Sequence, residues 1–87
     1  MINQHFEYLL KMNSAVFRDF IGKKIRILYT NYRGVTEWRC VTPLSFRTGK
    51  NEYHKEEQDL MFGYCYTRNE NREFSIKDIK KYEDISS

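Results

Sequence analysis

The sequence predicts a small, mainly β barrel of about five strands, with one N-terminal helix and a short C-terminal helical turn. Three observations lead to this fold class. Apolar residues recur at helical spacing before Gly22 and alternate with a period of two from residue 24 onward. The strand-like segments are short and separated by turn residues, and closing such a sheet removes its exposed edges. Aromatic residues make up 16% of the chain, enough large rings to fill a small core with few side chains.

The length of 87 residues fits one domain. We expect residues 1–22 to form a helix packed on the barrel, residues 23–82 to form the barrel, and residues 83–87 to be a flexible tail. Charged residues break every apolar run within a few positions, so neither a signal peptide nor a membrane span is predicted. This predicts a cytoplasmic protein in which Cys40 and Cys65 are reduced thiols.

The N-terminal segment from Asn3 to Ile21 has the pattern of an amphipathic helix. Its apolar stripe consists of Phe6, Leu9, Leu10, Val16, Phe17 and Phe20. Asn3 is placed as the N-cap, and Gly22 stands where the helix should end. Asn13 and Ser14 prefer caps to helix interiors and can divide the segment into two shorter helices. We expect the stripe to pack against the barrel.

Two strands are predicted in the first half of the barrel. Residues 24–30 form the first and are apolar on nearly both faces, and residues 36–46 form the second. Residues 31–34 between them have turn chemistry, with Gly34 able to take a positive φ. Pro43 cannot donate to a strand ladder, so it marks an edge, a bulge or the end of the second strand.

A turn and a polar loop are predicted next, over residues 48–51 and 52–59 respectively. Residues 60–67 form the clearest strand of the chain. One face of it carries Leu60, Phe62, Tyr64 and Tyr66, and the other carries Met61, Gly63 and Cys65. Gly63 indicates a bulge or a sharp bend, which a small barrel needs in order to close.

The last part of the barrel contains a hairpin turn at residues 68–71 and a short strand at residues 72–76. Phe74 and Ile76 are expected to point inward, and Glu73 and Ser75 outward. Residues 76–79 then resemble a helical turn, with Ile79 and Tyr82 folding back as a plug. Short, bent strands within about 60 residues favour a barrel of the SH3/Sm-like kind over an open sheet.

The formal net charge of +3 conceals an asymmetry along the chain. Residues 18–50 contain eight Lys or Arg and two Asp or Glu, a net charge of +6, whereas residues 51–87 contain six and nine, a net charge of −3. A basic block of this kind favours contact with nucleic acid or another polyanion. The alternative is an ordinary solvated surface of mixed charge.

Several short motifs occur in a characteristic order along most of the chain. The segments are residues 29–34, 39–43, 53–58, 60–65, 72–74 and 76–79. In this order and spacing, residues 25–79 resemble WYL domains, particularly the short stand-alone WYL-like proteins of bacteria and phages. The name-giving Trp-Tyr-Leu positions fall on Asp59, Leu60 and Met61, so an acid replaces the tryptophan and an aliphatic residue replaces the tyrosine. This departure concerns a ligand contact rather than the fold.

The resemblance implies an SH3/Sm-like barrel and a sensing or regulatory module rather than an enzyme. WYL domains typically bind negatively charged ligands, nucleotides or single-stranded nucleic acid, and they act in transcription regulation and phage defence. By motif, their second-strand arginine corresponds to Arg39 and their late-strand arginine to Arg72.

Arg39 and Arg72 also have the strongest physical case for contact with a ligand. A guanidinium presents a planar fork of donors suited to phosphate, and two of them on neighbouring strands would clamp an anion. The alternative is a cross-strand ion pair with Glu37 or Glu73 as partner. Further candidates for the same surface are Tyr29, Tyr32, Arg33, Arg26 and Lys77.

Four rings can stack on bases if the partner is single-stranded: Tyr29, Tyr32, Trp38 and Tyr64. Their alternative role is in the core, as for most aromatic residues of so small a chain. Tyr32 lies beside Arg33 in the turn and is the one expected to be exposed. His54 is expected to anchor the loop before the strand at residues 60–67.

No pattern for catalysis, a cofactor or a metal is present. The chain lacks a glycine-rich phosphate loop, a nucleophile elbow and a histidine–carboxylate pair at helical spacing. Its histidines and cysteines are scattered without the paired spacing of zinc ligands. We therefore expect a non-enzymatic binding module for a nucleotide or single-stranded nucleic acid. The alternative is a small adaptor or accessory protein that docks on a larger protein or forms a homodimer, since Asp59 and Leu60 would then signify a lost ligand pocket.

Overall fold

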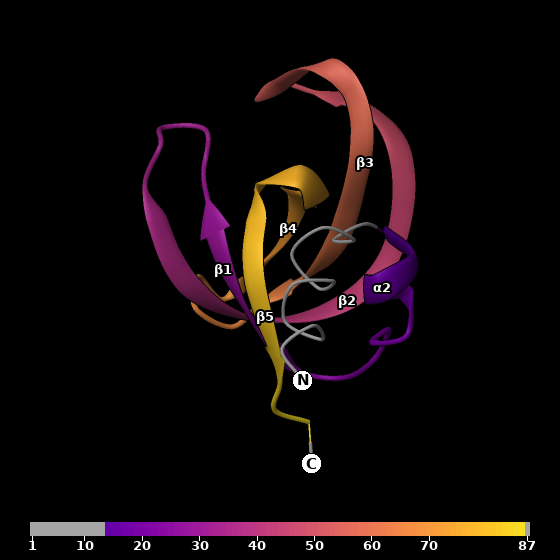
Figure 1. Ribbon diagram of the computed structural model, residues 1–87, viewed down its shortest axis with the longest axis vertical. Helices are drawn as coiled ribbons and strands as arrows, with labels where there is room; N and C mark the ends of the chain where they lie inside the picture. The colour runs from indigo at the N-terminus through magenta and orange to yellow at the C-terminus, as the bar shows by residue number, and fades with distance from the viewer. Residues whose placement is uncertain (1–13, 87) are drawn as a thin grey trace, which may run out of the picture.

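The computed structural model describes residues 14–86, which form a five-stranded antiparallel sheet with one short helix (Figure 1). The elements are α2 (Ser14–Arg18), β1 (Ile25–Thr30), β2 (Thr36–Asn51), β3 (His54–Cys65), β4 (Glu70–Ser75), the 3-10 helix η1 (Ile76–Asp78) and β5 (Ile79–Asp84). The strand order β4-β3-β2-β1-β5 places the last strand beside the first. The predicted mainly β class with a C-terminal helical turn is confirmed.

The sheet is strongly curved, and Figure 1 shows β2 and β3 arching together over one side of the molecule. Its two edge strands, β4 and β5, are joined only by the three residues of η1. A link of this length spans at most roughly 14 Å, so the end of one edge lies near the start of the other. No hydrogen-bonded ladder joins β4 to β5 within residues 14–86, so the sheet is not closed.

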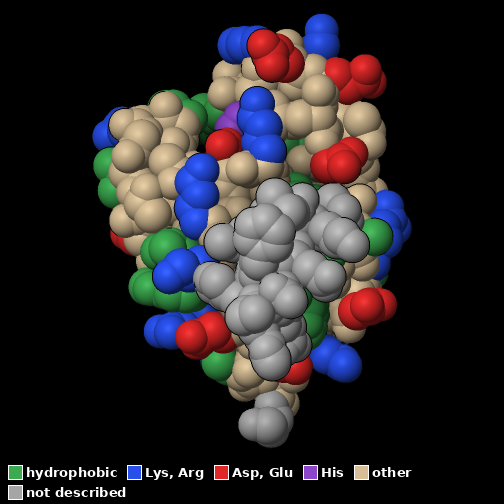
Figure 2. Space-filling view, in the orientation of Figure 1, with side chains coloured by type: hydrophobic (Ala, Val, Ile, Leu, Met, Phe, Trp, Pro, Cys, Tyr) green, Lys and Arg blue, Asp and Glu red, His purple; other side chains and the backbone are tan. Residues whose placement is uncertain are grey.

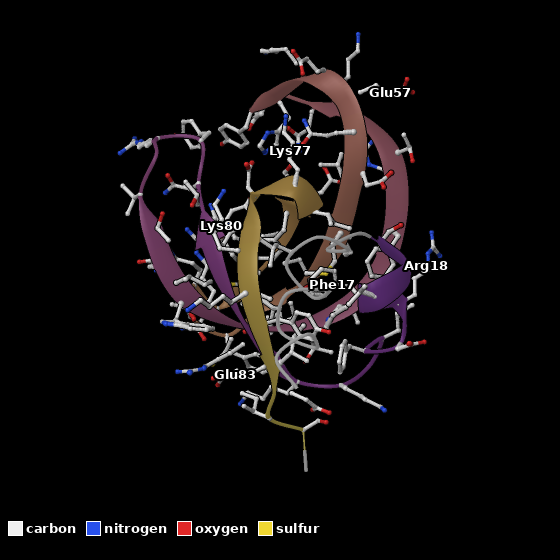
Figure 3. The ribbon with its side chains drawn as sticks, in the orientation of Figure 1. Phe17, Arg18, Glu57, Lys77, Lys80 and Glu83 are labelled. Atoms are coloured by element: carbon white, nitrogen blue, oxygen red, sulfur yellow. The ribbon has the colours of Figure 1, made fainter. Side chains whose placement is uncertain are left out.

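The core is built from inward-facing residues of the strands together with two side chains from helical elements, Phe17 of α2 and Ile76 of η1. Its buried members are Phe17, Ile25, Ile27, Tyr29, Val41, Met61, Cys65, Phe74, Ile76 and Ile79. Phe17 reaches into it from α2, and its ring meets that of Tyr82 in β5 edge-on at a centroid distance of 5.1 Å (Figure 3). Val16 and Phe20 pack against the same cluster, so the described part of the predicted apolar stripe does pack on the sheet. The predicted helical residues before Ser14 lie outside the described part of the chain.

The turn between β1 and β2 is organised by a single asparagine side chain. Asn31 Oδ1 accepts hydrogen bonds from the backbone N–H groups of Arg33 (2.9 Å) and Val35 (3.0 Å). Gly34 has φ 84°, a left-handed conformation in which a side chain would be strained. The predicted turn is confirmed, and short-range Asn and Gly chemistry accounts for it.

The predicted turn at residues 48–51 and loop at residues 52–59 are wrong. β2 continues to Asn51 and β3 begins at His54, so the hairpin extends well beyond the core. Thr48 Oγ1 donates to Asp59 Oδ1 across the two strands (2.9 Å). A polar composition is typical of a loop, but a hairpin that is exposed or only half-buried is held by its backbone ladder and needs few apolar side chains. Asn51 Oδ1 turns the chain by accepting hydrogen bonds from the backbone N–H groups of Tyr53 and His54.

The predicted irregularity near Gly63 is present and lies on the neighbouring strand. Pro43 pairs with Gly63 and Ser45 with Phe62, so Leu44 is the extra residue of a bulge in β2. Pro43 is tolerated here because β1 pairs with β2 only as far as Val41. Met61, Gly63 and Cys65 share a buried face of β3, in line with the predicted alternation, but Leu60 of the other face is also fully buried and the strand ends at Cys65 rather than Thr67.

The end of the chain differs from expectation in three respects. β4 begins at Glu70, so the turn occupies residues 66–69 rather than 68–71. Ser75 was predicted to point outward but is fully buried, because its backbone N–H donates to the Tyr29 hydroxyl (3.0 Å). Ile79 and Tyr82 belong to a strand paired with β1, not to a plug, and this strand extends to Asp84, into the predicted tail. Ile76 points inward as predicted.

Among residues 14–86, no helix has the length and apolar content needed to cross a membrane. Cys40 and Cys65 are free thiols; Cys65 is buried and Cys40 is partly exposed.

The close approach of β2 to Gly63 gives a direct test of the curvature. A Cβ at this position would lie 2.6 Å from the Thr42 carbonyl oxygen, whereas a Cβ at Gly49 would lie 2.5 Å from Nη1 of the half-exposed Arg47 side chain, which can shift more easily than backbone although its guanidinium contacts Glu73. We expect Gly63→Ala to lower the free energy of unfolding by about 1–3 kcal/mol, as overpacking against backbone does. Gly49→Ala is the matched control and should cost clearly less in the same urea titration. Equal losses would show that β2 and β3 can separate freely at Gly63.

Candidate functional site

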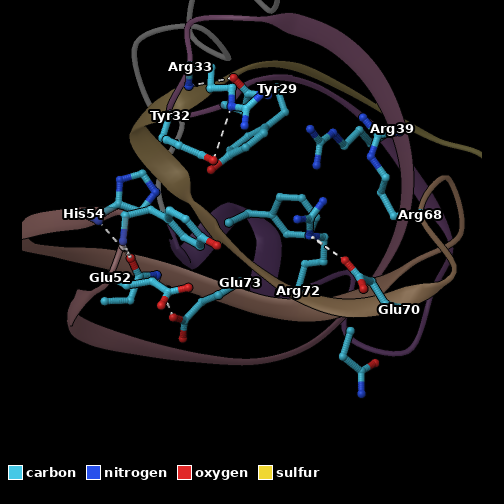
Figure 4. Close-up of a pocket in the computed structure, with 15 residues that line it drawn as sticks. Tyr29, Tyr32, Arg33, Arg39, Glu52, His54, Arg68, Glu70, Arg72 and Glu73 are labelled. Atoms are coloured by element: carbon cyan, nitrogen blue, oxygen red, sulfur yellow. Dashed lines mark hydrogen bonds and ion pairs between the residues drawn. The ribbon is translucent and has the colours of Figure 1, made fainter.

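A pocket of about 770 Å³ lies between the β1–β2 turn, the β2–β3 turn and β4 (Figure 4). This volume is in the range of small-molecule sites, roughly 300–1,000 Å³. Its residues come from segments far apart in the sequence, so only the folded sheet brings them together. The pocket has a buried floor, a basic end and an aromatic end.

The floor is formed by Tyr29 of β1 and Phe74 of β4, both almost fully buried. Their rings meet edge-on at a centroid distance of 5.0 Å. Burial raises the pKa of the Tyr29 phenol above its ordinary value of 10.0, and Ser75 N–H donates to its oxygen. The floor is therefore apolar and uncharged, a low-dielectric surface that strengthens electrostatic contacts made above it.

Arg39 is the unusual residue of the site, since only 3% of it is exposed. It lies on the inner side of β2, and its guanidinium carbon is 5.4 Å from the centroid of the Tyr29 ring, a cation–π contact. Its Nε lies 3.2 Å from Glu37 Oε2 but is not aligned to donate, so this buried nitrogen has no hydrogen-bond partner. A buried donor without a partner is costly, and an acceptor brought by a ligand would relieve that cost.

Two further arginines share the basic end of the pocket with Arg39. Arg68 comes from the β3–β4 turn and contacts Glu37, the same carboxylate that lies beside Arg39. Arg72 comes from β4, and its Nε lies 3.2 Å from Glu70 Oε2. In Figure 4 the guanidinium groups of Arg39 and Arg72 both point into the pocket interior. Both arginines thus form ion pairs, but with a glutamate two residues away on the same strand rather than across strands: Arg39 with Glu37 and Arg72 with Glu70, of which only Glu70 lines the pocket.

The aromatic end is a pair of tyrosines that connects two turns. The rings of Tyr32 and Tyr53 stack with centroids 4.5 Å apart and an interplanar angle of 27°. They are 57% and 49% exposed, which confirms that Tyr32 is an exposed ring. Arg33 Nε donates to the Tyr32 hydroxyl (3.3 Å). This end of the pocket offers ring faces to a planar group.

Five of the seven binding residues predicted from the sequence line this pocket: Tyr29, Tyr32, Arg33, Arg39 and Arg72. Arg26 does not, because it pairs with Glu83 (2.7 Å) and stacks on Trp38 with its guanidinium carbon 4.2 Å from the ring centroid. Lys77 does not line it either and is exposed on η1. His54 lines the pocket as the first residue of β3, and its backbone N–H anchors it to Asn51. It is therefore a strand residue rather than a loop residue, and the anchoring role of its side chain stays a prediction.

Sequence reasoning missed several lining residues, above all Arg68, Glu70 and Tyr53. Arg68 and Glu70 were placed in a hairpin turn, and no local pattern shows that this turn borders a pocket. Tyr53 was assigned to a polar loop. Its position two residues after Asn51, whose side chain turns the hairpin, was the available signal.

The basic block of residues 18–50 is in part neutralised by the acidic part of the chain. Arg26 pairs with Glu83 and Arg47 pairs with Glu73, and both glutamates lie in the acidic part of the chain, residues 51–87. Figure 2 shows Lys and Arg interspersed with Asp and Glu over the face in view. Among the described residues, no three His, Cys, Asp or Glu side chains are grouped so that they could hold a metal ion.

Glu73 joins the hairpin to β4 beside the pocket. It accepts hydrogen bonds from Arg47 Nε (2.7 Å), Arg47 Nη2 (2.9 Å) and Asn51 Nδ2 (2.9 Å). Chiefly through the Arg47 bonds, the pKa of Glu73 is held below its ordinary value of 4.5. A lowered folded-state pKa adds stability above the unfolded-state pKa, and this stability is lost as the pH falls through the folded-state pKa.

We therefore expect the free energy of unfolding to fall less in Glu73→Gln than in the parent chain when the pH is lowered from about 7 to about 3. Urea titrations at the two pH values measure this difference in the free energy of unfolding. Glu56→Gln removes an exposed carboxylate of β3 away from the pocket and should leave the difference nearly unchanged. If both variants behave like the parent chain, the Arg47–Glu73 contact does not hold the carboxylate in its charged form.

Comparison with known proteins identifies no family for this chain, so its function is inferred from the residues of the pocket. The chain matches no protein-family model, and no curated protein is significantly similar to it.

Proposed function

We propose that this chain is a non-enzymatic regulatory module that binds a nucleotide or single-stranded nucleic acid in the pocket. The observation that carries the proposal is the buried guanidinium of Arg39, which faces the same pocket as Arg68 and Arg72 and has a donor without a partner. Arginine forks match phosphate geometry, and hydrogen bonds between charged groups are about twice as strong as neutral ones. The stacked rings of Tyr32 and Tyr53 supply a surface for a base.

The finer fold assignment is part of the same proposal. A curved sheet whose edge strands are linked by only three residues supports an SH3/Sm-like barrel. The ordered motifs that resemble WYL domains support the same barrel and a role in transcription regulation or phage defence. Two free thiols support a reducing, cytoplasmic setting.

One arginine of the pocket allows a clean test. We expect Arg72→Ala to weaken binding of AMP by about 10- to 100-fold, the loss expected for a hydrogen bond to a charged group. Its side chain is partly exposed, so the fold should tolerate the change. Lys77→Ala is the matched control, because it also removes one positive charge but lies outside the pocket lining. Isothermal titration calorimetry of the parent chain and both variants measures the effect; equal affinities for all three would rule out this pocket.

A second candidate function is that of a protein–protein adaptor. It is favoured by exposed apolar side chains on the adjacent strands β2 and β3, namely Leu44 at the bulge and Phe62 opposite Ser45. Light scattering should then show a dimer, or a stable complex with a protein partner, that Phe62→Ser disrupts. A monomeric chain that binds AMP would instead favour the first candidate.

A further inference from the structure

The two strands that carry the pocket arginines share one short pattern, a glutamate two residues before the arginine. On β2 it is Glu37 and Arg39, and on β4 it is Glu70 and Arg72. Residues two apart in a strand lie on the same face, so each carboxylate lies beside its own guanidinium. In both pairs the Nε–Oε2 distance is 3.2 Å. The pocket arginines therefore carry their own counter-ions.

This arrangement leaves only a small surplus of positive charge at the basic end. Arg39, Arg68 and Arg72 bring three positive charges, and Glu37 and Glu70 bring two negative ones. The remaining surplus of one suits a single phosphate group. A nucleic-acid strand carries a phosphate at every nucleotide, and its binding ordinarily depends on several Lys or Arg contacts along the backbone.

The rim of the pocket adds repulsion along the path that a strand would follow. The Glu70 side chain is 55% exposed at the basic end, and Glu52 is exposed at the aromatic end. A nucleotide in the interior of a strand has phosphates on both sides, and these would have to leave the pocket past the two carboxylates. A free mononucleotide has no such phosphates.

The hydrogen-bonding capacity of the basic end also favours a terminal phosphate. Each guanidinium has five N–H donors, and three guanidinium groups reach this end from three different elements. A phosphate monoester presents three acceptor oxygens and carries a charge of about −1.5 to −2 at neutral pH. A phosphodiester within a strand has fewer free oxygens and one charge.

We infer that the pocket selects a compact phosphate monoester, such as a free mononucleotide, over the interior of a nucleic-acid strand, and that Glu70 sets part of this selection. The inference rests on the proposed function and chooses between its two ligand classes. The phosphate lies among Arg39, Arg68 and Arg72, and the base lies against the rings of Tyr32 and Tyr53. The glutamates permit one phosphate and repel its neighbours.

The test compares AMP, adenosine and a ten-residue adenine oligodeoxynucleotide that lacks terminal phosphates. Binding to the parent chain, Glu70→Gln and Glu57→Gln is measured by calorimetry at one fixed low salt concentration. Glu57 is the matched control, because it is an exposed carboxylate of β3 that points away from the molecule at the far end of the hairpin (Figure 3). Both variants remove one negative charge.

We expect the parent chain to bind AMP more tightly than either adenosine or the oligonucleotide. In Glu70→Gln the preference for AMP over the oligonucleotide should fall by about fivefold, the effect of one unit charge at contact distance in water. Glu57→Gln should keep the parent preference. An oligonucleotide that binds the parent chain as tightly as AMP overturns the inference but leaves the proposed function standing. An unchanged preference in Glu70→Gln overturns the role of Glu70, and absence of binding to both AMP and the oligonucleotide overturns the proposed function as well.

Discussion

The structure depends on the double pairing of β1, which forms one antiparallel ladder with β2 and another with β5. Its inner side chains, Ile25 and Ile27, are completely buried, and Tyr29 continues the same row to the floor of the pocket. β1 lies between these two partners, and the curved sheet wraps its row of buried side chains. The pocket is a product of this curvature, since it brings β4 to the Tyr29 hydroxyl through Ser75.

The arrangement of the strands also determines where charges meet. β5 brings Glu83 to Arg26, and the extended hairpin brings Arg47 to Glu73 on β4. Positive charges that form a block in the sequence are thus distributed over a surface of mixed sign. Arg39 and Arg72 of the pocket instead contact glutamates two residues away on their own strands. The site therefore combines a buried guanidinium with only a small surplus of positive charge.

Local chemistry made much of the fold predictable from the sequence. The alternation of residues 24–30 matches β1, and the Asn31 and Gly34 turn is as expected because its hydrogen bonds join near neighbours. Pro43 and Gly63 indicated the bulge that they flank. The hairpin over residues 48–59 was not predictable in this way, since its polar side chains carry no burial pattern. β5 was missed because its partner is a strand far away in the sequence.

The site was predictable only where one residue's chemistry was informative. Arg39 and Arg72 were identified by guanidinium chemistry and by the resemblance to WYL domains, whereas Arg26 was proposed from charge alone and lies outside the pocket. Arg68 and Tyr53 enter the pocket through contacts between turns, which no single segment encodes.

The pairing of β1 with β5 also has a consequence for how the chain folds. Arg26 and Glu83, which face each other across this ladder, are 57 residues apart in sequence. Contacts of such long range must overcome a large loop-closure entropy before they contribute stability, which slows folding. During synthesis β1 leaves the ribosome long before β5, so one edge of an apolar strand stays unpaired until nearly all of the described chain has been made. That interval, rather than the finished sheet, is when this protein is most exposed to aggregation and to chaperones.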